Sequence, residues 1–361
     1  MKNKLTNDLS LLEEMIKDLN SKYKVDPFWK NYEYSNIAKI KHFDLKELLQ
    51  FNNSFGLLSS KRYTTFGNYF IRFYFGILIK IKKYFNIDIS FPKIFKILNF
   101  FNLTIDDPKL TRTHYSSFIL KLINSLPNSD KLLNIKDDLI CDPIDTLELR
   151  DKKYSFNFIK YFYEFLMANN FANLEKSNFF LEIGGGYGGF TEIVKKMCPN
   201  IKIIYMDIPP QLYVAEQYLK SIFYKKVAGF KETKEMEFIT QDSFLDYDIL
   251  IVPPWDIIKI KNNLIDFFYN ANSFQEMQKE TVSNYCKQLS RIVKNKIVLL
   301  EQREGNGAIV NPVTRAEYID YMKSNGFKLV EERLVAYGGH LRSDPSAPFC
   351  HSDLYFFEKA N

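Results

Sequence analysis

The chain has 361 residues, of which 46% are hydrophobic and 25% charged, and its net charge is +6. This composition is that of an ordinary soluble globular protein. The length exceeds the size at which one hydrophobic core usually stops growing, so we expect one large domain with a smaller one attached. The cysteines form no C-x-x-C pair, which argues against a zinc site and a disulfide framework and predicts a reducing compartment. They are Cys141, Cys198, Cys286 and Cys350.

The N-terminal sequence predicts an amphipathic helix over residues 1–19, because acidic residues interrupt what would be the apolar region of a signal peptide. The most apolar segment, at 69–79, contains Arg72. It is much shorter than the ~20 residues that a membrane span needs. We therefore expect no integral membrane segment and a cytoplasmic protein.

Positive charge is concentrated in residues 61–100, where eight basic residues face Asp88 alone, a net charge of +7. Such a segment could contact a phosphorylated glycan carrier, nucleic acid or an anionic membrane. The simpler interpretation, a solvated face of an aromatic-rich helix, is favoured. The basic residues are Lys61, Arg62, Arg72, Lys80, Lys82, Lys83, Lys93 and Lys96.

Residues 1–150 show helical periodicity without a convincing series of strands, and the turn-like segment 141–155 marks a boundary. We expect a mainly helical N-terminal domain at 1–150, which shapes the acceptor pocket or a homo-oligomer contact, and a second domain at 151–361. The second domain begins with a helix at 158–171, which carries an apolar face at i, i+3, i+4 spacing.

From residue 178 onward, predicted strands alternate with helices, which indicates a parallel sheet covered on both faces. The segment 237–244 is interpreted as the third strand, and only one of the extended segments 248–254 and 264–271 need be the fourth central strand. Thr314 and Glu317 have the spacing of a capping box, which predicts a helix that stops at Gly326. The last two strands, at 327–335 and 353–359, have the pattern of an antiparallel hairpin.

Five of the six residues 184–189 are glycines, in a loop between the first strand and its helix. The loop fits both the dinucleotide fingerprint and the acid-x-G-x-G-x-G loop of S-adenosylmethionine (SAM) enzymes. Both templates place an acid at the end of the second strand, where Asp207 can accept the ribose hydroxyl groups. Glu182 and the closing hairpin favour SAM, because a carboxylate suits a cationic sulfonium and an amino group, whereas a pyrophosphate would gain nothing from it. The expected fold is therefore α/β, a Rossmann-like class I SAM methyltransferase sheet.

The sequence also resembles the family of sugar O-methyltransferases that includes the enzyme methylating the deoxysugar of nanchangmycin. The resemblance is carried by "LEIGGGYGGF" at 181–190, "DIPPQLYVAEQYL" at 207–219 and "NSFQEMQKETVSNY" at 272–285, with Ile208 where the family has leucine. It implies methyl transfer to a sugar hydroxyl, in surface polysaccharide or glycosylated metabolite biosynthesis. The expected cofactor-binding residues are Glu182, Gly184, Gly185, Gly186, Tyr187, Gly188, Asp207, Ile208, Gln241, Asp242 and Asn272.

Methyl transfer to a hydroxyl group needs a base for the departing proton. The candidates are His340 and His351, in a loop rich in glycine, proline and serine, and Glu276. Glu276 has an alternative structural role, because Ser273 and Glu276 are spaced as a capping box for the next helix. Arg342, Arg303 and Glu304 are the expected substrate-binding residues. No paired carboxylate spacing specifies a metal ion, so none is assigned.

Two alternative functions remain open. The segment "DILIVPPW" at 248–255 imitates the strand end of enzymes that methylate amino groups of nucleic-acid bases. Val252 stands where those enzymes need an Asp or Asn, so we expect no nucleic-acid partner. The other alternative is a non-catalytic scaffold with the SAM fold, which the absence of an unambiguous base favours and the intact glycine loop and Asp207 oppose.

Overall fold

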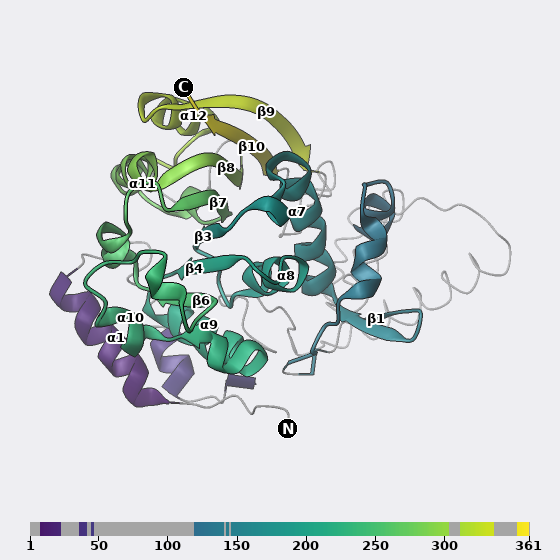
Figure 1. The fold of residues 1–361 in the computed structure, drawn as a ribbon, viewed down its shortest axis with the longest axis horizontal. Coiled ribbons are helices and arrows are strands. Elements are labelled where there is room, and N and C mark those ends of the chain that lie inside the picture. Colours follow the sequence, from purple (N-terminus) through teal and green to yellow (C-terminus); the bar gives the residue numbers. More distant parts are fainter. Residues whose placement is uncertain are drawn as a thin grey trace, which may run out of the picture.

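A computed structural model of the chain describes residues 8–22, 36–41, 45–46, 119–140, 142–143, 146–302, 311–335 and 352–360 (Figure 1). The basic segment at 61–100 lies outside these ranges. Among the described residues, no helix is both long and apolar enough to span a bilayer.

In the described part of the N-terminal region, most residues are helical. Helix α1 spans Leu9–Lys22, further helical segments occupy 36–41 and 119–124, and a 3-10 helix covers Ser129–Asn134. A small hairpin follows, with β1 at Thr146–Leu149 and β2 at Lys152–Ser155. The residues between its strands, Arg150 and Asp151, both have left-handed backbone conformations, with φ of 44° and 58°. The expected domain boundary at 150 thus falls within this turn.

The second region is built on an eight-stranded sheet whose order is β5-β6-β4-β3-β7-β8-β10-β9. The strands β3 to β8 pair in parallel, and β10 pairs antiparallel with β8 and with β9. This mixed α/β, Rossmann-like methyltransferase sheet with an antiparallel end confirms the predicted fold class. The strands are β3 Phe179–Ile183, β4 Lys202–Met206, β5 Val227–Ala228, β6 Ile249–Val252, β7 Ile265–Ala271, β8 Val293–Gln302, β9 Phe327–Val335 and β10 Ser352–Lys359.

Helices cover both faces of the sheet (Figure 1). They bury two apolar cores against it. One core joins residues of α1, α7, α8, α9 and α10 to one face. The other joins α11 and α12 to the opposite face. The bounds are α7 Phe156–Ala172, α8 Gly189–Met197, α9 Pro209–Phe223, α10 Phe230–Lys234, α11 Lys279–Ile292 and α12 Arg315–Ser324.

The starts of these helices follow from local chemistry. The Ser155 hydroxyl accepts the main-chain N–H of Phe158 and caps α7. The predicted capping box of α12 is confirmed, since the Glu317 carboxylate accepts the Thr314 N–H at 2.9 Å. Gly326, expected to stop this helix, has φ +81°, a conformation that glycine adopts without strain.

One strand prediction was wrong. The segment 237–244 forms no sheet strand; Ile239 makes an isolated bridge with Ile260, and a 3-10 helix occupies Asp242–Phe244. The central position assigned to this segment belongs to β6, which pairs with β4. Both of the other extended segments therefore lie in the sheet, as β6 and β7, where only one was required.

Helix α1 lies beside α9 and α10 (Figure 1), and it is attached to the sheet domain by apolar packing and by polar contacts. Its buried side chains Leu12, Met15 and Leu19 belong to the same core as α9. At its polar face, Asp18 accepts a hydrogen bond from the Trp255 indole at 2.8 Å. Glu14 accepts one from Lys234 at 2.7 Å.

Candidate functional site

The carboxyl ends of β3, β4, β7 and β8 lie along one edge of the sheet, because these strands are parallel neighbours. From β3, the chain passes to β4 on one side, whereas β7 lies on the other side, so the strand order reverses at β3. Ligands of open α/β sheets bind at such a switch point, outside the carboxyl ends of the strands. The loops that start at Gly184, Asp207 and Asn272 all follow strands that end here.

The glycine loop passes very close to the loop that follows β7. Gly184 has φ +74°, and a Cβ atom built on it would lie 2.0 Å from the Ser273 Oγ. Any side chain at this position would displace Ser273 as well as strain the backbone. At the other end of the loop, Gly188 has φ +90° and is the N-cap of α8. The bare backbone is therefore required by the geometry of two adjoining loops.

Asp207 connects the end of β4 to the glycine loop. Its carboxylate accepts the main-chain N–H of Gly186 at 2.9 Å and that of Ile208 at 2.8 Å. The Tyr205 hydroxyl lies 3.2 Å from the same carboxylate and 2.5 Å from the Gly186 carbonyl oxygen. Desolvation raises the pKa of Asp207 to about 7, although the two amides lower it. The residue as a whole is half-buried at the edge of the sheet.

Glu182 lies beneath the glycine loop. Its side chain is buried, accepts a hydrogen bond from the Thr191 hydroxyl of α8, and contacts Gly185 closely. Burial raises the pKa of this carboxyl group to about 8. These contacts give Glu182 a role in shaping the loop, and its expected contact with the cofactor stays a prediction.

The Tyr187 ring packs into the core below the loop. It is buried and makes an edge-on contact with Tyr218, with ring centroids 4.9 Å apart. This placement leaves the main chain of Tyr187 as the part that continues the loop along the edge of the sheet.

The loop after β7 carries Asn272, Ser273 and Glu276. Asn272 has φ +54°, and its N–H donates to the Leu300 carbonyl of β8 at 2.7 Å. The proposed capping box is wrong, because the Ser273 side chain makes no capping hydrogen bond and α11 begins at Lys279 behind Gln278. Glu276 ends a short 3-10 helix instead and is half-buried at the carboxyl edge.

Two buried polar residues that were not among the expected site residues hold this loop. The Asn270 amide donates to the Ile183 carbonyl at 2.7 Å and accepts the Phe274 N–H at 3.1 Å. The Glu301 carboxylate accepts the N–H groups of Phe274 and Gln275, both at 3.2 Å. Desolvation raises the pKa of Glu301 well above its usual range, against the effect of these amides. The available signal was a polar residue inside each apolar strand, "IDFFYNA" and "KIVLLEQ".

Gln241 and Asp242 lie at the opposite, amino edge of the sheet. The Phe244 carbonyl accepts a hydrogen bond from Lys202, the first residue of β4, at 3.1 Å. The Phe244 ring also lies 5.5 Å from that of Phe179, the first residue of β3. The structure therefore does not bring Gln241 and Asp242 together with the glycine loop, because β6 rather than 237–244 is the third strand.

The remaining expected residues, His340, His351, Arg342, Arg303 and Glu304, lie outside the described residues. Their roles stay predictions from the sequence. Within the described ranges, no group of three or more His, Cys, Asp or Glu side chains could hold a metal ion.

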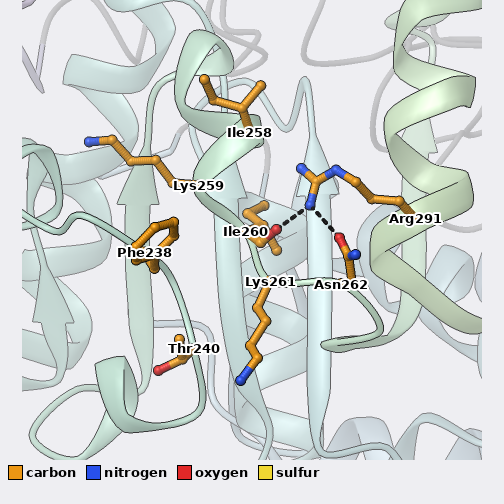
Figure 2. Close-up of a pocket in the computed structure, with 8 residues that line it drawn as sticks. All are labelled: Phe238, Thr240, Ile258, Lys259, Ile260, Lys261, Asn262 and Arg291. Atoms are coloured by element: carbon orange, nitrogen blue, oxygen red, sulfur yellow. Dashed lines mark hydrogen bonds between the residues drawn. The ribbon is translucent and has the colours of Figure 1, made fainter.

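A pocket also lies at the amino edge of the sheet (Figure 2). Arg291, near the end of α11, donates to the Ile257 carbonyl at 2.8 Å and to the Asn262 side chain at 3.0 Å. The Asn263 N–H donates to the Arg291 carbonyl at 2.9 Å, just before β7 begins. No residue expected in the site lines this pocket, whose lining is Phe238, Thr240, Ile258, Lys259, Ile260, Lys261, Asn262 and Arg291.

No protein-family model matches the chain, and no curated protein matches it either. Among solved structures, it is similar to magnesium protoporphyrin IX methyltransferase from Synechocystis with bound SAH, at 12% identity and a TM-score of 0.37 over 55% of this chain and 80% of that one. It is also similar to mitomycin 7-O-methyltransferase, at 10% identity and a TM-score of 0.36 over 70% of this chain and 69% of that one. The resemblance to sugar O-methyltransferases thus depends on the sequence motifs alone. The assignment of the fold depends on the strand order of the sheet.

Proposed function

We propose that the protein is a SAM-dependent O-methyltransferase that acts on a sugar hydroxyl group, in surface polysaccharide or glycosylated metabolite biosynthesis. The observation that carries the cofactor assignment is the contact between Asp207 and the glycine loop at the carboxyl edge. A carboxylate at the end of the second central strand can accept ribose hydroxyl groups, while the main chain at 184–188 approaches the methionine part of the cofactor.

SAM, when bound, supplies the electrophilic methyl group. The protein has to orient the acceptor oxygen in line with the methyl carbon and to accept the proton that the hydroxyl group loses. Glu276 is one candidate for this base, and its position at the carboxyl edge supports that assignment. His340 and His351 are the alternatives that the sequence predicts, with Arg342, Arg303 and Glu304 in contact with the acceptor.

The choice of a sugar acceptor is supported by the three motifs that the chain shares with sugar O-methyltransferases. The helical N-terminal region would shape the acceptor site or a homo-oligomer contact, and the cytoplasm remains the predicted compartment. Gln241 and Asp242 are no longer part of the proposed cofactor site, since they lie at the amino edge of the sheet.

Isothermal titration with SAM tests the cofactor, and incubation with labelled SAM and a panel of nucleotide sugars and extracted glycans tests the acceptor. We expect heat at micromolar SAM and transfer of label to at least one sugar, identified by mass analysis. No heat would favour the scaffold function. Binding with label in nucleic acid and none in any glycan would contradict the sugar assignment.

A further inference from the structure

The loops on the two sides of the switch point are connected by a continuous set of buried hydrogen bonds. The Met206 carbonyl of β4 accepts the Gly184 N–H at 2.8 Å. The preceding residue, Ile183, accepts the Asn270 amide through its carbonyl oxygen at 2.7 Å. Asn270 in turn accepts the Phe274 N–H. One polar path thus runs from β4 through β3 to the loop after β7.

Glu301 completes this path from β8. Its side chain has no exposed surface, and each carboxylate oxygen accepts one of two successive amides, those of Phe274 and Gln275. A buried polar group that loses its hydrogen-bond partner destabilises a protein. Without Glu301, the Gln275 N–H would lose this acceptor and the Phe274 N–H would keep only Asn270, so the loop at 272–276 would be held less firmly.

The position of that loop fixes the glycine loop as well. Ser273 directly precedes the amides held by Glu301, and its hydroxyl occupies the space where a Gly184 side chain would be. A displacement of 272–276 therefore changes the surface on which Gly184 rests. Glu276, on the same loop, moves with it.

We propose that Glu301 and Asn270 are positioning residues that hold the loop 272–276 against Gly184, so that the cofactor loop and the loop bearing Glu276 form one rigid unit. The consequence for methyl transfer depends on the proposed function. The connection between the loops does not, and can be measured without a ligand.

Hydrogen–deuterium exchange on the full chain tests the connection. In Glu301→Gln, we expect amide exchange to accelerate about tenfold or more in peptides covering 272–278 and also in peptides covering 183–189. Asp266→Asn is the matched control, because the Asp266 carboxylate accepts two successive amides, of Asn178 and Phe179, at the amino edge. It should accelerate exchange near 178–180 and leave both loops unchanged.

Titration with SAM then measures the functional effect. We expect the Kd to rise about tenfold in Glu301→Gln and less than twofold in Asp266→Asn, even if both lower the Tm equally. If Glu301→Gln does not fold, both hydrogen–deuterium exchange and the SAM titration can be measured on Asn270→Ser instead, since this change removes the other acceptor of the Phe274 N–H.

If exchange accelerated at 272–278 but stayed unchanged at 183–189, the inference would be overturned. An unchanged Kd for SAM in a variant in which exchange accelerates in both loops would also overturn it. A different result identifies a failure of the proposed function. If the wild-type protein binds no SAM but the exchange pattern is as expected, the positioning role stands and the cofactor assignment fails.

Discussion

The Asp207 carboxylate and the Gly186 main-chain N–H are 2.9 Å apart, so the protein's own atoms join the end of β4 to the glycine loop. This contact holds the loop near the acid that is proposed to bind ribose. Asp207 thus has two consequences that can be separated by experiment, one for loop geometry and one for cofactor affinity.

Replacing Asp207 should remove cofactor binding. We expect Asp207→Ala to weaken SAM binding by at least about a hundredfold, because the ribose hydroxyl groups and the Gly186 amide lose a charged acceptor. Titration calorimetry measures this. Asp242→Ala is the control, since Asp242 lies at the amino edge, and it should change the Kd less than twofold. A comparable loss in both variants would contradict the position of the cofactor.

SAM affinity should also depend on pH. Desolvation raises the pKa of Asp207 to about 7, and the ionised carboxylate is the better acceptor for hydroxyl groups. Lowering the pH protonates the carboxylate and so weakens binding, by about tenfold between pH 8 and pH 6 for a pKa near 7. In Asp207→Asn, this tenfold change should disappear, and any pH dependence that remains would arise from other groups such as Glu182, whose pKa burial raises to about 8. Tighter binding at pH 6 would show that the neutral acid is the binding form.

Gly184 should not tolerate a side chain. An alanine there would have φ +74° and a Cβ atom 2.0 Å from the Ser273 Oγ, so we expect a lower Tm and loss of SAM binding. Gly326→Ala separates the two causes, because Gly326 has φ +81° but no atom within 4 Å of an added Cβ. This control should show only the cost of a left-handed backbone, about 1–2 kcal/mol in the free energy of unfolding. Equal stability of the two variants would mean that Ser273 moves aside freely.

Loss of the base should leave cofactor binding intact. We expect His340→Ala to keep the Kd for SAM within about twofold of wild type and to lower turnover by roughly 10²–10⁴-fold. Glu276→Gln tests the rival assignment in the same assay, with the acceptor that the sugar panel identifies. The variant that loses turnover identifies the base. Full turnover in both would contradict both assignments.

Much of the order of elements was predictable, because β3 and β4 are short apolar runs that each lead into a helix. The glycine loop, Asp207 and the capping box of α12 depend on spacing within one segment, which is why the sequence shows them. The closing strand β10 was also visible, but its insertion between β8 and β9 is a property of the whole sheet.

The misassigned third strand shows the limit of local patterns. Residues 237–244 were interpreted as a strand, yet Ile239 pairs only in an isolated bridge with Ile260, outside the sheet. The four residues of β6 are apolar throughout, as a strand buried on both faces requires. The sequence pattern alone cannot decide which of these two neighbouring segments enters the sheet. Because 237–244 was taken as a strand, Gln241 and Asp242 were predicted at the carboxyl edge, whereas they lie at the amino edge.

The roles of Asn270 and Glu301 could not be predicted for a different reason. Both are polar residues within largely apolar strands. Their common partner, the Phe274 N–H, lies on the loop after β7. Only the pairing of β7 with both β3 and β8 brings the three together.

The attachment of α1 bears on how the protein can be produced for these experiments. Leu12, Met15 and Leu19 have no exposed surface and share a core with Leu212 and Tyr213 of α9. A truncated chain starting at residue 151 would uncover that part of α9 and leave the Trp255 indole without its Asp18 acceptor. Such a fragment would be prone to self-association, so recombinant versions should retain residues 8–22, in the same polypeptide or as an added peptide.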